Sequence, residues 1–110
     1  MADAPKSCKE AFEQAPVNFN KDAAKGLKAV YQFDLSGDGG GQWAILIDND
    51  QCTVQEGKHP SPSITISMTA QDYLDLLSGK LNGQMAFMTG KLRIAGDLGL
   101  AIKLQTLFNS

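Results

Sequence analysis

Few residues in this 110-residue chain have the types and spacing that acid–base or nucleophilic chemistry requires. His59 is the only histidine, and it lies in a proline-containing loop. A general base needs a partner within hydrogen-bond reach, and the spacing around His59 supports no Ser-His-Asp or Cys-His arrangement. Asp72 and Asp75 fall on the exposed face of a predicted helix and form no catalytic pair. The sequence therefore predicts a surface histidine and no catalytic residue.

Two short motifs resemble ligand-binding loops, and each lacks a feature that the loop needs. Residues 48–50 could begin a calcium loop, but Thr53 stands where that loop requires Gly and His59 where it requires Glu. The glycine-rich run 37–41 joins two strands, so it lacks the helix N-terminus that binds phosphate. Cys8 and Cys52 are too few for a zinc site or a disulfide scaffold and are expected to be small buried hydrophobic residues. We expect no metal and no cofactor.

Methionines and aromatic residues give a clearer signal, which indicates ligand binding. Met68, Met85 and Met88 have unbranched, polarizable side chains, which fill irregular apolar space and suit pockets for varied lipids. Methionines at helical spacing also occur in ordinary cores, so the pattern has two interpretations. The same two interpretations apply to Phe33 and Trp43, which lie on predicted strands.

A closing helix, predicted to begin after Asp97, is apolar on two faces. At about 100° per residue, one face carries Leu98, Ala101, Ile102 and Gln105, and the other carries Leu100, Leu104, Leu107 and Phe108. A helix this apolar is usually covered on several sides, so the rest of the domain, a partner or an apolar ligand must cover its second face. Gln105 needs hydrogen-bond partners if it is buried; a ligand head group or the backbone would supply them.

The first half of the chain should form helices and then three antiparallel strands. Ser7 and Glu10 form a capping-box pattern for a helix that Pro16 should end. A second short helix is expected over 20–25. From Leu27 onward apolar residues alternate with polar ones, which is typical of half-buried strands. The predicted strands are 31–35, 43–47 and 52–54, joined by a glycine-rich hairpin at 36–41 and a turn at 48–50.

In the second half, the chain should cross back over the sheet and then form the apolar helices. The loop 56–63 is long enough to cross the sheet, and Thr69, Asn82 and Asp97 are suitable N-caps. This order of elements predicts an α+β domain with helices on one face of a mixed sheet. The predicted elements are a strand at 64–68, a helix at 69–79, a short helix at 82–90, a strand at 91–95 and the closing helix.

A long run of residues in the last third resembles a known family. It comprises Gly79-Lys80-Leu81, then 84–97 (Gln-Met-Ala-Phe-Met-Thr-Gly-Lys-Leu-Arg-Ile-Ala-Gly-Asp) and 100–105 (Leu-Ala-Ile-Lys-Leu-Gln). This run resembles the C-terminal signature of the sterol carrier protein 2 (SCP2) domain. The resemblance implies a five-stranded mixed sheet covered on one face by helices. It also implies an apolar tunnel between the sheet and the C-terminal helices, with the positions of Phe33 and Gln105 at or near it.

Length and charge are consistent with one lipid-binding domain over residues 1–110. A net charge of −2 gives no reason to expect nucleic acid as a partner. The charge is uneven: residues 1–79 hold six Lys against eleven Asp or Glu (−5), and residues 80–110 hold four cations against Asp97 (+3). An anionic head group, a CoA phosphate or an anionic bilayer would be attracted to such a segment; simple solvation is the alternative. The four cations are Lys80, Lys91, Arg93 and Lys103.

We interpret the chain as a non-catalytic carrier that binds and transfers a fatty acid, a fatty acyl-CoA or a sterol-like lipid. The alternative is a protein-interaction module whose C-terminal helix docks on a partner enzyme or on a second copy. Transient contact with an anionic membrane is expected, with a monomer as the expected state and a dimer as the alternative. The candidate ligand-binding residues are Phe33, Trp43, Met85, Met88, Leu100, Leu104, Gln105, Leu107 and Phe108.

A cytoplasmic location is expected from the ends and hydropathy of the sequence. No run approaches the roughly 18 apolar residues that span a bilayer. The first residues lack the apolar core of a signal peptide. The C-terminal Phe-Asn-Ser differs from the Ser-Lys-Leu peroxisomal signal.

Overall fold

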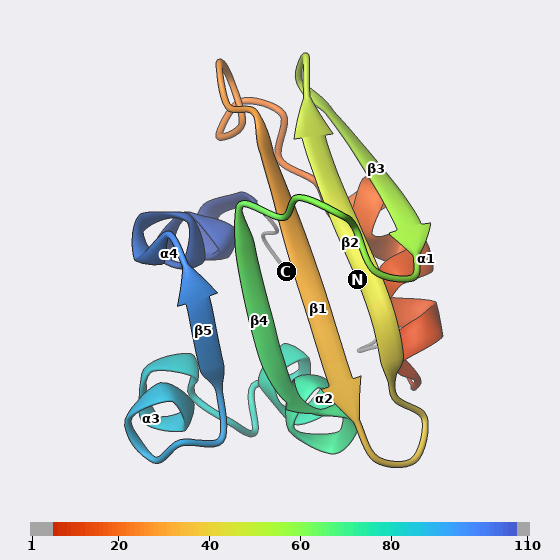
Figure 1. Cartoon of the computed structure of the whole chain (residues 1–110), viewed down its shortest axis with the longest axis vertical. Coiled ribbons are helices and arrows are strands. Elements are labelled where there is room, and N and C mark those ends of the chain that lie inside the picture. Colours follow the sequence, from red (N-terminus) through yellow and green to blue (C-terminus); the bar gives the residue numbers. More distant parts are fainter. Residues whose placement is uncertain (1–5, 108–110) are drawn as a thin grey trace.

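A five-stranded mixed sheet forms the centre of the molecule (Figure 1). The structure is a computed structural model, and it describes residues 6–107. The order across the sheet is β3-β2-β1-β4-β5; β1 and β4 are parallel and the other neighbours antiparallel. The predicted mixed sheet is therefore confirmed. The strands are β1 (Ala29–Ser36), β2 (Gly41–Asp48), β3 (Gln51–Glu56), β4 (Ile64–Thr69) and β5 (Arg93–Gly96).

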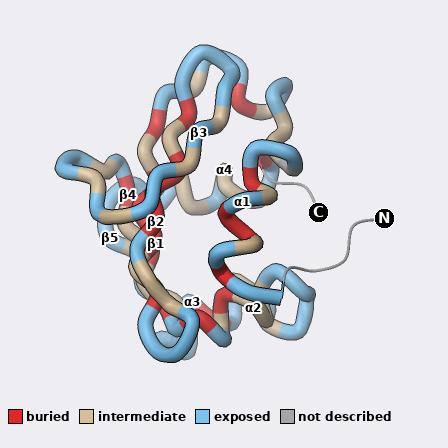
Figure 2. The backbone as a smooth tube through the Cα atoms, turned by 90° about the vertical axis from the view of Figure 1, so that its right-hand side faces the viewer, coloured by how far each residue is buried: buried red, intermediate tan, exposed pale blue. Residues whose placement is uncertain are grey.

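Four helices accompany the sheet, and α1, α2 and α4 lie on one of its faces (Figure 2). Their predicted N-caps are confirmed, because each cap side chain accepts a backbone N–H of the first turn. The Ser7 hydroxyl accepts from Glu10, that of Thr69 from Asp72, and the Asn82 amide oxygen from Gln84. The helices are α1 (Cys8–Asn18), α2 (Ala70–Ser78), α3 (Gly83–Met88) and α4 (Leu98–Leu107).

Two predicted helix details near the N-terminus were wrong. Helix α1 continues past Pro16 to Asn18; proline's fixed φ is itself helical, so the chain can add a last half-turn at the loss of one hydrogen bond. The expected helix over 20–25 is a set of turns. There the Asn20 side chain accepts the N–H groups of Asp22 and Ala23, and Gly26, with φ of 77°, reverses the chain at once.

The loop between β3 and β4 crosses the outer face of the sheet (Figure 1). The Gln32 side chain helps to hold it there. Gln32 is fully buried although it points away from the helices. Its side-chain oxygen accepts the His59 backbone N–H at 2.8 Å, and its amide nitrogen donates to the Gly57 carbonyl at 3.2 Å. The buried Gln32 amide thus holds the predicted crossing together with the Ser63–Val30 bonds, and His59 takes part through its backbone.

An aromatic cluster fills the inner face of the sheet beneath α1 and α2. The Phe12 ring stacks on Trp43, with centroids 4.7 Å apart, and on Tyr73 at 5.4 Å. It also meets the edge of Phe33 at 5.3 Å. Such pairs add to the stability that apolar burial alone provides. This half of the core is closely packed around Phe12, which is 1% exposed.

Candidate functional site

Burial on the inner face of the sheet differs between its two ends. At the α1 end, Cys8, Phe12 and Ala15 are buried. At the β5 end, several apolar residues on or next to β5 and on α4 pack on the core but are only partly buried. The interior is therefore incompletely covered at the β5 end, and at the α1 end the partial exposure is at Cys52 and Val54 of β3. The partly buried residues at the β5 end are Leu92, Ile94, Leu100, Ala101 and Leu104.

Helix α4 is attached to the rest of the domain by hydrogen bonds near both of its ends. The Tyr31 hydroxyl donates to the Leu100 carbonyl at 2.8 Å, and the Asn20 backbone N–H donates to the Leu107 carbonyl at 2.7 Å. Burial, with a smaller effect from the Asp97 carboxylate, raises the pKa of Tyr31 to about 12. The hydroxyl therefore keeps its proton at neutral pH and can donate. These bonds hold α4 over β4 and β5 although its middle is only partly buried.

One of the two apolar faces of α4 is turned to the sheet and the other to solvent. Leu107 is completely buried, and Leu100 and Leu104 are partly buried against the core. On the opposite face, Leu98 is 54% exposed and Ile102 is 73% exposed. Asp97 caps the helix as predicted, accepting the Gly99 N–H at 2.8 Å. The side chain of Gln105 and all of Phe108 lie outside the described part of the chain, so their expected roles stay predictions.

Helix α3 presents its methionines to solvent. Met85 is 56% exposed and Met88 is 72% exposed, while Ala86 is completely buried. The Leu92 N–H donates to the Ala86 carbonyl at 3.0 Å, which joins the helix to the start of β5. The two methionines are therefore exposed on the surface beside the start of β5.

The candidate residues do not form one contiguous lining. Phe33 and Trp43 belong to the aromatic cluster under α1, Leu100, Leu104 and Leu107 lie along the inner face of α4, and the two methionines are on α3. The candidate set left out Ile94 of β5 and Leu92, which directly precedes β5. Their alternation was a sufficient signal for a strand that faces the core, but only the fold shows that α4 leaves them partly uncovered.

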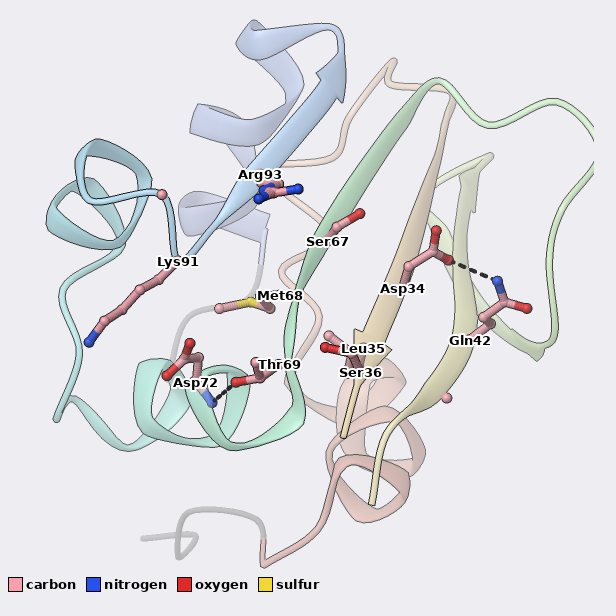
Figure 3. A pocket seen from close by; sticks show the side chains of 12 residues that line it. Asp34, Leu35, Ser36, Gln42, Ser67, Met68, Thr69, Asp72, Lys91 and Arg93 are labelled. Carbon is pink, nitrogen blue, oxygen red and sulfur yellow. Dashed lines mark hydrogen bonds between the residues drawn. The ribbon is translucent and has the colours of Figure 1, made fainter. Parts of the chain in front are cut away.

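Two open hollows of the described surface lie away from the inner face of α4. The larger, about 640 Å³, extends from the outer face of the sheet to the start of α2, where Thr69 and Asp72 line it (Figure 3). Gln42, Asp34, Ser67 and Arg93 form a row there across four neighbouring strands, and the Gln42 amide donates to Asp34 at 3.3 Å. The smaller, about 300 Å³, lies between α1, β2 and β3. Neither contains a paired nucleophile and base.

Within residues 6–107 no group of three or more His, Cys, Asp or Glu side chains is placed to hold a metal ion. Both cysteines are free thiols. Burial raises the pKa of Cys8 and raises that of Cys52 to about 11. Thiols with raised pKa values hold few thiolates at neutral pH and are weak nucleophiles.

Residues 9–109 match the SCP-2 sterol transfer family. The chain belongs to this family. Hydroxysteroid dehydrogenase-like protein 2 of Homo sapiens is 39% identical over 101 residues, which are 91% of this chain and 24% of that protein. The chain thus spans about a quarter of such curated relatives, and in them the SCP2 domain is one part of a larger protein.

Solved structures of SCP2 domains have the same fold. The sterol carrier protein domain 2 of Helicoverpa armigera is 32% identical, with a TM-score of 0.69 over 87% of this chain and 78% of that one. Palmitated SCP2L2 of Aedes aegypti is 26% identical, with a TM-score of 0.69 over 94% of this chain and 96% of that one. In the described part of this SCP2 domain, no helix is both long enough and apolar enough to cross a bilayer.

Proposed function

We propose that this SCP2 domain carries an apolar lipid without converting it chemically. The observation that supports this most directly is the partly covered end of the core, where apolar side chains of β5 and α4 remain in reach of a ligand. An alkyl chain placed there would complete the burial of Leu92, Ile94 and Leu104. A fatty acid, a fatty acyl-CoA and a sterol-like molecule each have an apolar part that would cover these residues. The palmitated state of the Aedes aegypti relative favours a fatty acyl group.

The energetics of transfer require no catalytic group. Burying a methylene is worth about 0.8 kcal/mol, so a chain of about 16 carbons has a gross drive of roughly 12 kcal/mol to leave water. A bilayer offers nearly the same gain. Exchange between membrane and protein is therefore close to neutral, and weak, apolar contacts are enough for a carrier.

Within the proposed site the alkyl chain lies along the inner face of α4, with Met85 and Met88 at its solvent side. Gln105 is proposed to bind the head group, and Phe108 to extend the apolar lining. Phe33 and Trp43 would take part only if the ligand reached inward to the aromatic cluster. We propose a monomer that acts in the cytoplasm and makes transient contact with anionic membranes.

The second candidate function is a protein-interaction module. It is favoured by the exposed apolar residues Leu98 and Ile102 on α4. In this case α4 would dock on a partner enzyme or a second copy, and the core would hold no lipid. Relatives that carry the domain within dehydrogenase-like proteins make an enzyme partner a reasonable form of this alternative.

Native mass spectrometry of the purified protein distinguishes the two functions. A carrier should show added masses of bound lipid, or should gain one equivalent of fatty acid after delipidation and reloading. Failure to load any of fatty acid, acyl-CoA or sterol would contradict the carrier function. A stable dimer that never contains lipid, measured by light scattering, would support the interaction module in its place.

A further inference from the structure

Strand β3 is the last strand on its side of the sheet, and within residues 6–107 its outer edge has no partner strand (Figure 1). It pairs with β2 from Gln51 to Glu56 in one continuous register. Sheet edges are usually protected by lysine, proline, a bulge or short length. The other edge strand, β5, is short, with four residues. Residues 51–56 of β3, Gln-Cys-Thr-Val-Gln-Glu, have none of these protections, so this edge is open to another strand.

The register identifies which backbone groups of β3 face outward. The Gly57 N–H donates to the Gln42 carbonyl at 2.7 Å, so these two residues form a hydrogen-bonded pair one step beyond the end of β3. Hydrogen-bonded and non-hydrogen-bonded pairs alternate along an antiparallel ladder. The residues that direct their N–H and C=O groups away from β2 are therefore Cys52, Val54 and Glu56. Their side chains share one face of the sheet, which is the inner face because Cys52 and Val54 pack on the core.

A hollow of about 300 Å³ lies beside the same residues, between α1 and β3, with α1 on the inner face of the sheet (Figure 2). Its apolar lining comes from Phe12, Pro16, Trp43 and Val54. The volume is about ten times the roughly 30 Å³ share of one water molecule, so a large side chain fits. In an added strand, the residue opposite Val54 would direct its side chain to this inner face. An open strand edge and a side-chain pocket thus lie together, which is the arrangement that binds peptides by strand addition.

The charge around this edge is acidic. Helix α1 and residues 48–56 together contain five Asp or Glu and one Lys, a net charge of −4. The charged residues that line the hollow are Lys9, Glu13 and Glu56. Two copies of the chain paired through β3 would bring this acidic charge together, which is unfavourable. A cationic segment would be attracted to it, so the charge favours a basic partner over a second copy.

We propose that β3 binds an extended, basic peptide segment of a partner protein by strand addition. The segment pairs antiparallel with β3, with a large apolar side chain opposite Val54 in the hollow and a Lys or Arg opposite Glu56. Main-chain hydrogen bonds supply affinity, and the hollow with its acidic residues supplies specificity. This site is at the α1 end of the sheet, so it is separate from the proposed lipid site and from the exposed face of α4, and it depends on neither.

Fluorescence anisotropy with a labelled synthetic peptide tests the proposal on the full chain. The probe is Lys-Thr-Leu-Thr-Val-Thr-Lys, whose first Lys would lie opposite Glu56 and whose Leu would lie opposite Val54. Methylating the backbone nitrogens of Leu and Val should weaken binding by about 25-fold, because these N–H groups face β3 and each hydrogen bond contributes roughly fivefold. Methylating the first two Thr nitrogens is the matched control and should have little effect, since those N–H groups face away from β3.

Charge reversal tests the acidic residues of the hollow. Glu13→Lys/Glu56→Lys should bind the probe about tenfold more weakly, because like charges would then face each other. It should instead bind a peptide in which both Lys are replaced by Glu. The control Asp22→Lys/Asp38→Lys makes the same charge change at exposed residues outside the hollow and should bind the probe like wild type. Thermal melts should show that these variants fold, and all should still bind a fluorescent fatty acid.

Four results would overturn the proposal. The first is no measurable binding of the probe by the wild type, and the second is an equal effect of the two methylation patterns. The third is equal binding of the probe by the wild type and Glu13→Lys/Glu56→Lys. The fourth is a dimer in light scattering that Val54→Lys dissociates, which would identify the edge as a contact between copies. Loss of fatty acid binding with probe binding intact would instead count against the carrier function alone.

Discussion

At the level of single residues, α4 shows why a helix with two apolar faces is informative. Leu104 and Ile102 are two positions apart and have similar side chains, yet one packs toward the core and the other is 73% exposed. Their spacing predicted two faces but could not say which one met the sheet. That choice depends on tertiary contacts such as the hydrogen bond from the Tyr31 hydroxyl to the Leu100 carbonyl. No sequence pattern predicts this bond.

Replacing Leu104 with Asp should weaken binding of a fluorescent fatty acid by about tenfold or more, because a carboxylate would stand in the apolar site. Ile102→Asp is the matched control on the solvent face of the same helix and should bind normally. Fluorescence titration with urea unfolding of both variants checks this. If Leu104→Asp lost stability and affinity in equal measure, the inner face of α4 would be core rather than a ligand surface.

The Tyr31 hydroxyl should stabilise the domain through the Leu100 carbonyl. Tyr31→Phe should lower the free energy of unfolding by about 1–2 kcal/mol, since it leaves a carbonyl without its donor. Burial favours the protonated form, so this contribution is complete below pH 10 and is lost as the pH rises toward about 12. Wild type should therefore lose more stability than Tyr31→Phe between pH 10 and pH 12 in urea titrations. Parallel curves would show that the bond contributes nothing.

At the level of elements, periodicity predicted the strands and N-caps because these depend on neighbouring residues. Alternating residues located β1, β2 and β4, and Ser7, Thr69, Asn82 and Asp97 all cap as expected. The helix expected over 20–25 is a set of turns because its backbone hydrogen bonds join residues three apart, Ala24 to Lys21 and Lys25 to Asp22, and Gly26 in the left-handed region ends the segment. The site itself was less predictable, since the incomplete cover at the β5 end arises only when β5 and α4 are placed on the sheet.

The junction between β5 and α4 depends on Gly96. Its φ is 114°, and an added Cβ would stand 2.7 Å from the Ser63 carbonyl oxygen. Gly96→Ala should therefore destabilise the domain by about 1–3 kcal/mol and weaken lipid binding by displacing α4. Gly83→Ala is the control, because its Cβ would make only an ordinary 3.5 Å contact with Leu76. Equal melting temperatures for Gly96→Ala and Gly83→Ala would contradict this account of the junction.

At the level of the whole molecule, lipid binding and folding should be linked. A ligand that binds only the folded state at 100 times its dissociation constant adds about 2.7 kcal/mol, which is about 10 °C in Tm for a domain of this size. Calorimetry with and without fatty acid should show this rise, and Leu104→Asp should reduce it. An unchanged Tm at saturating fatty acid would favour the interaction module.

The parallel pairing of β1 with β4 has a consequence for the order in which the domain assembles. Tyr31 aligns with Ile64, so this contact must close a long loop, whereas β1, β2 and β3 join through short turns. Contacts that close long loops form slowly, and β5 with α4 can dock only after β4 is in place. The last segment to join should also be the first to open. Amide hydrogens of β5 should therefore exchange faster than those of β1 and β2, and a guest molecule could be admitted through this local opening while the hairpin core stays folded.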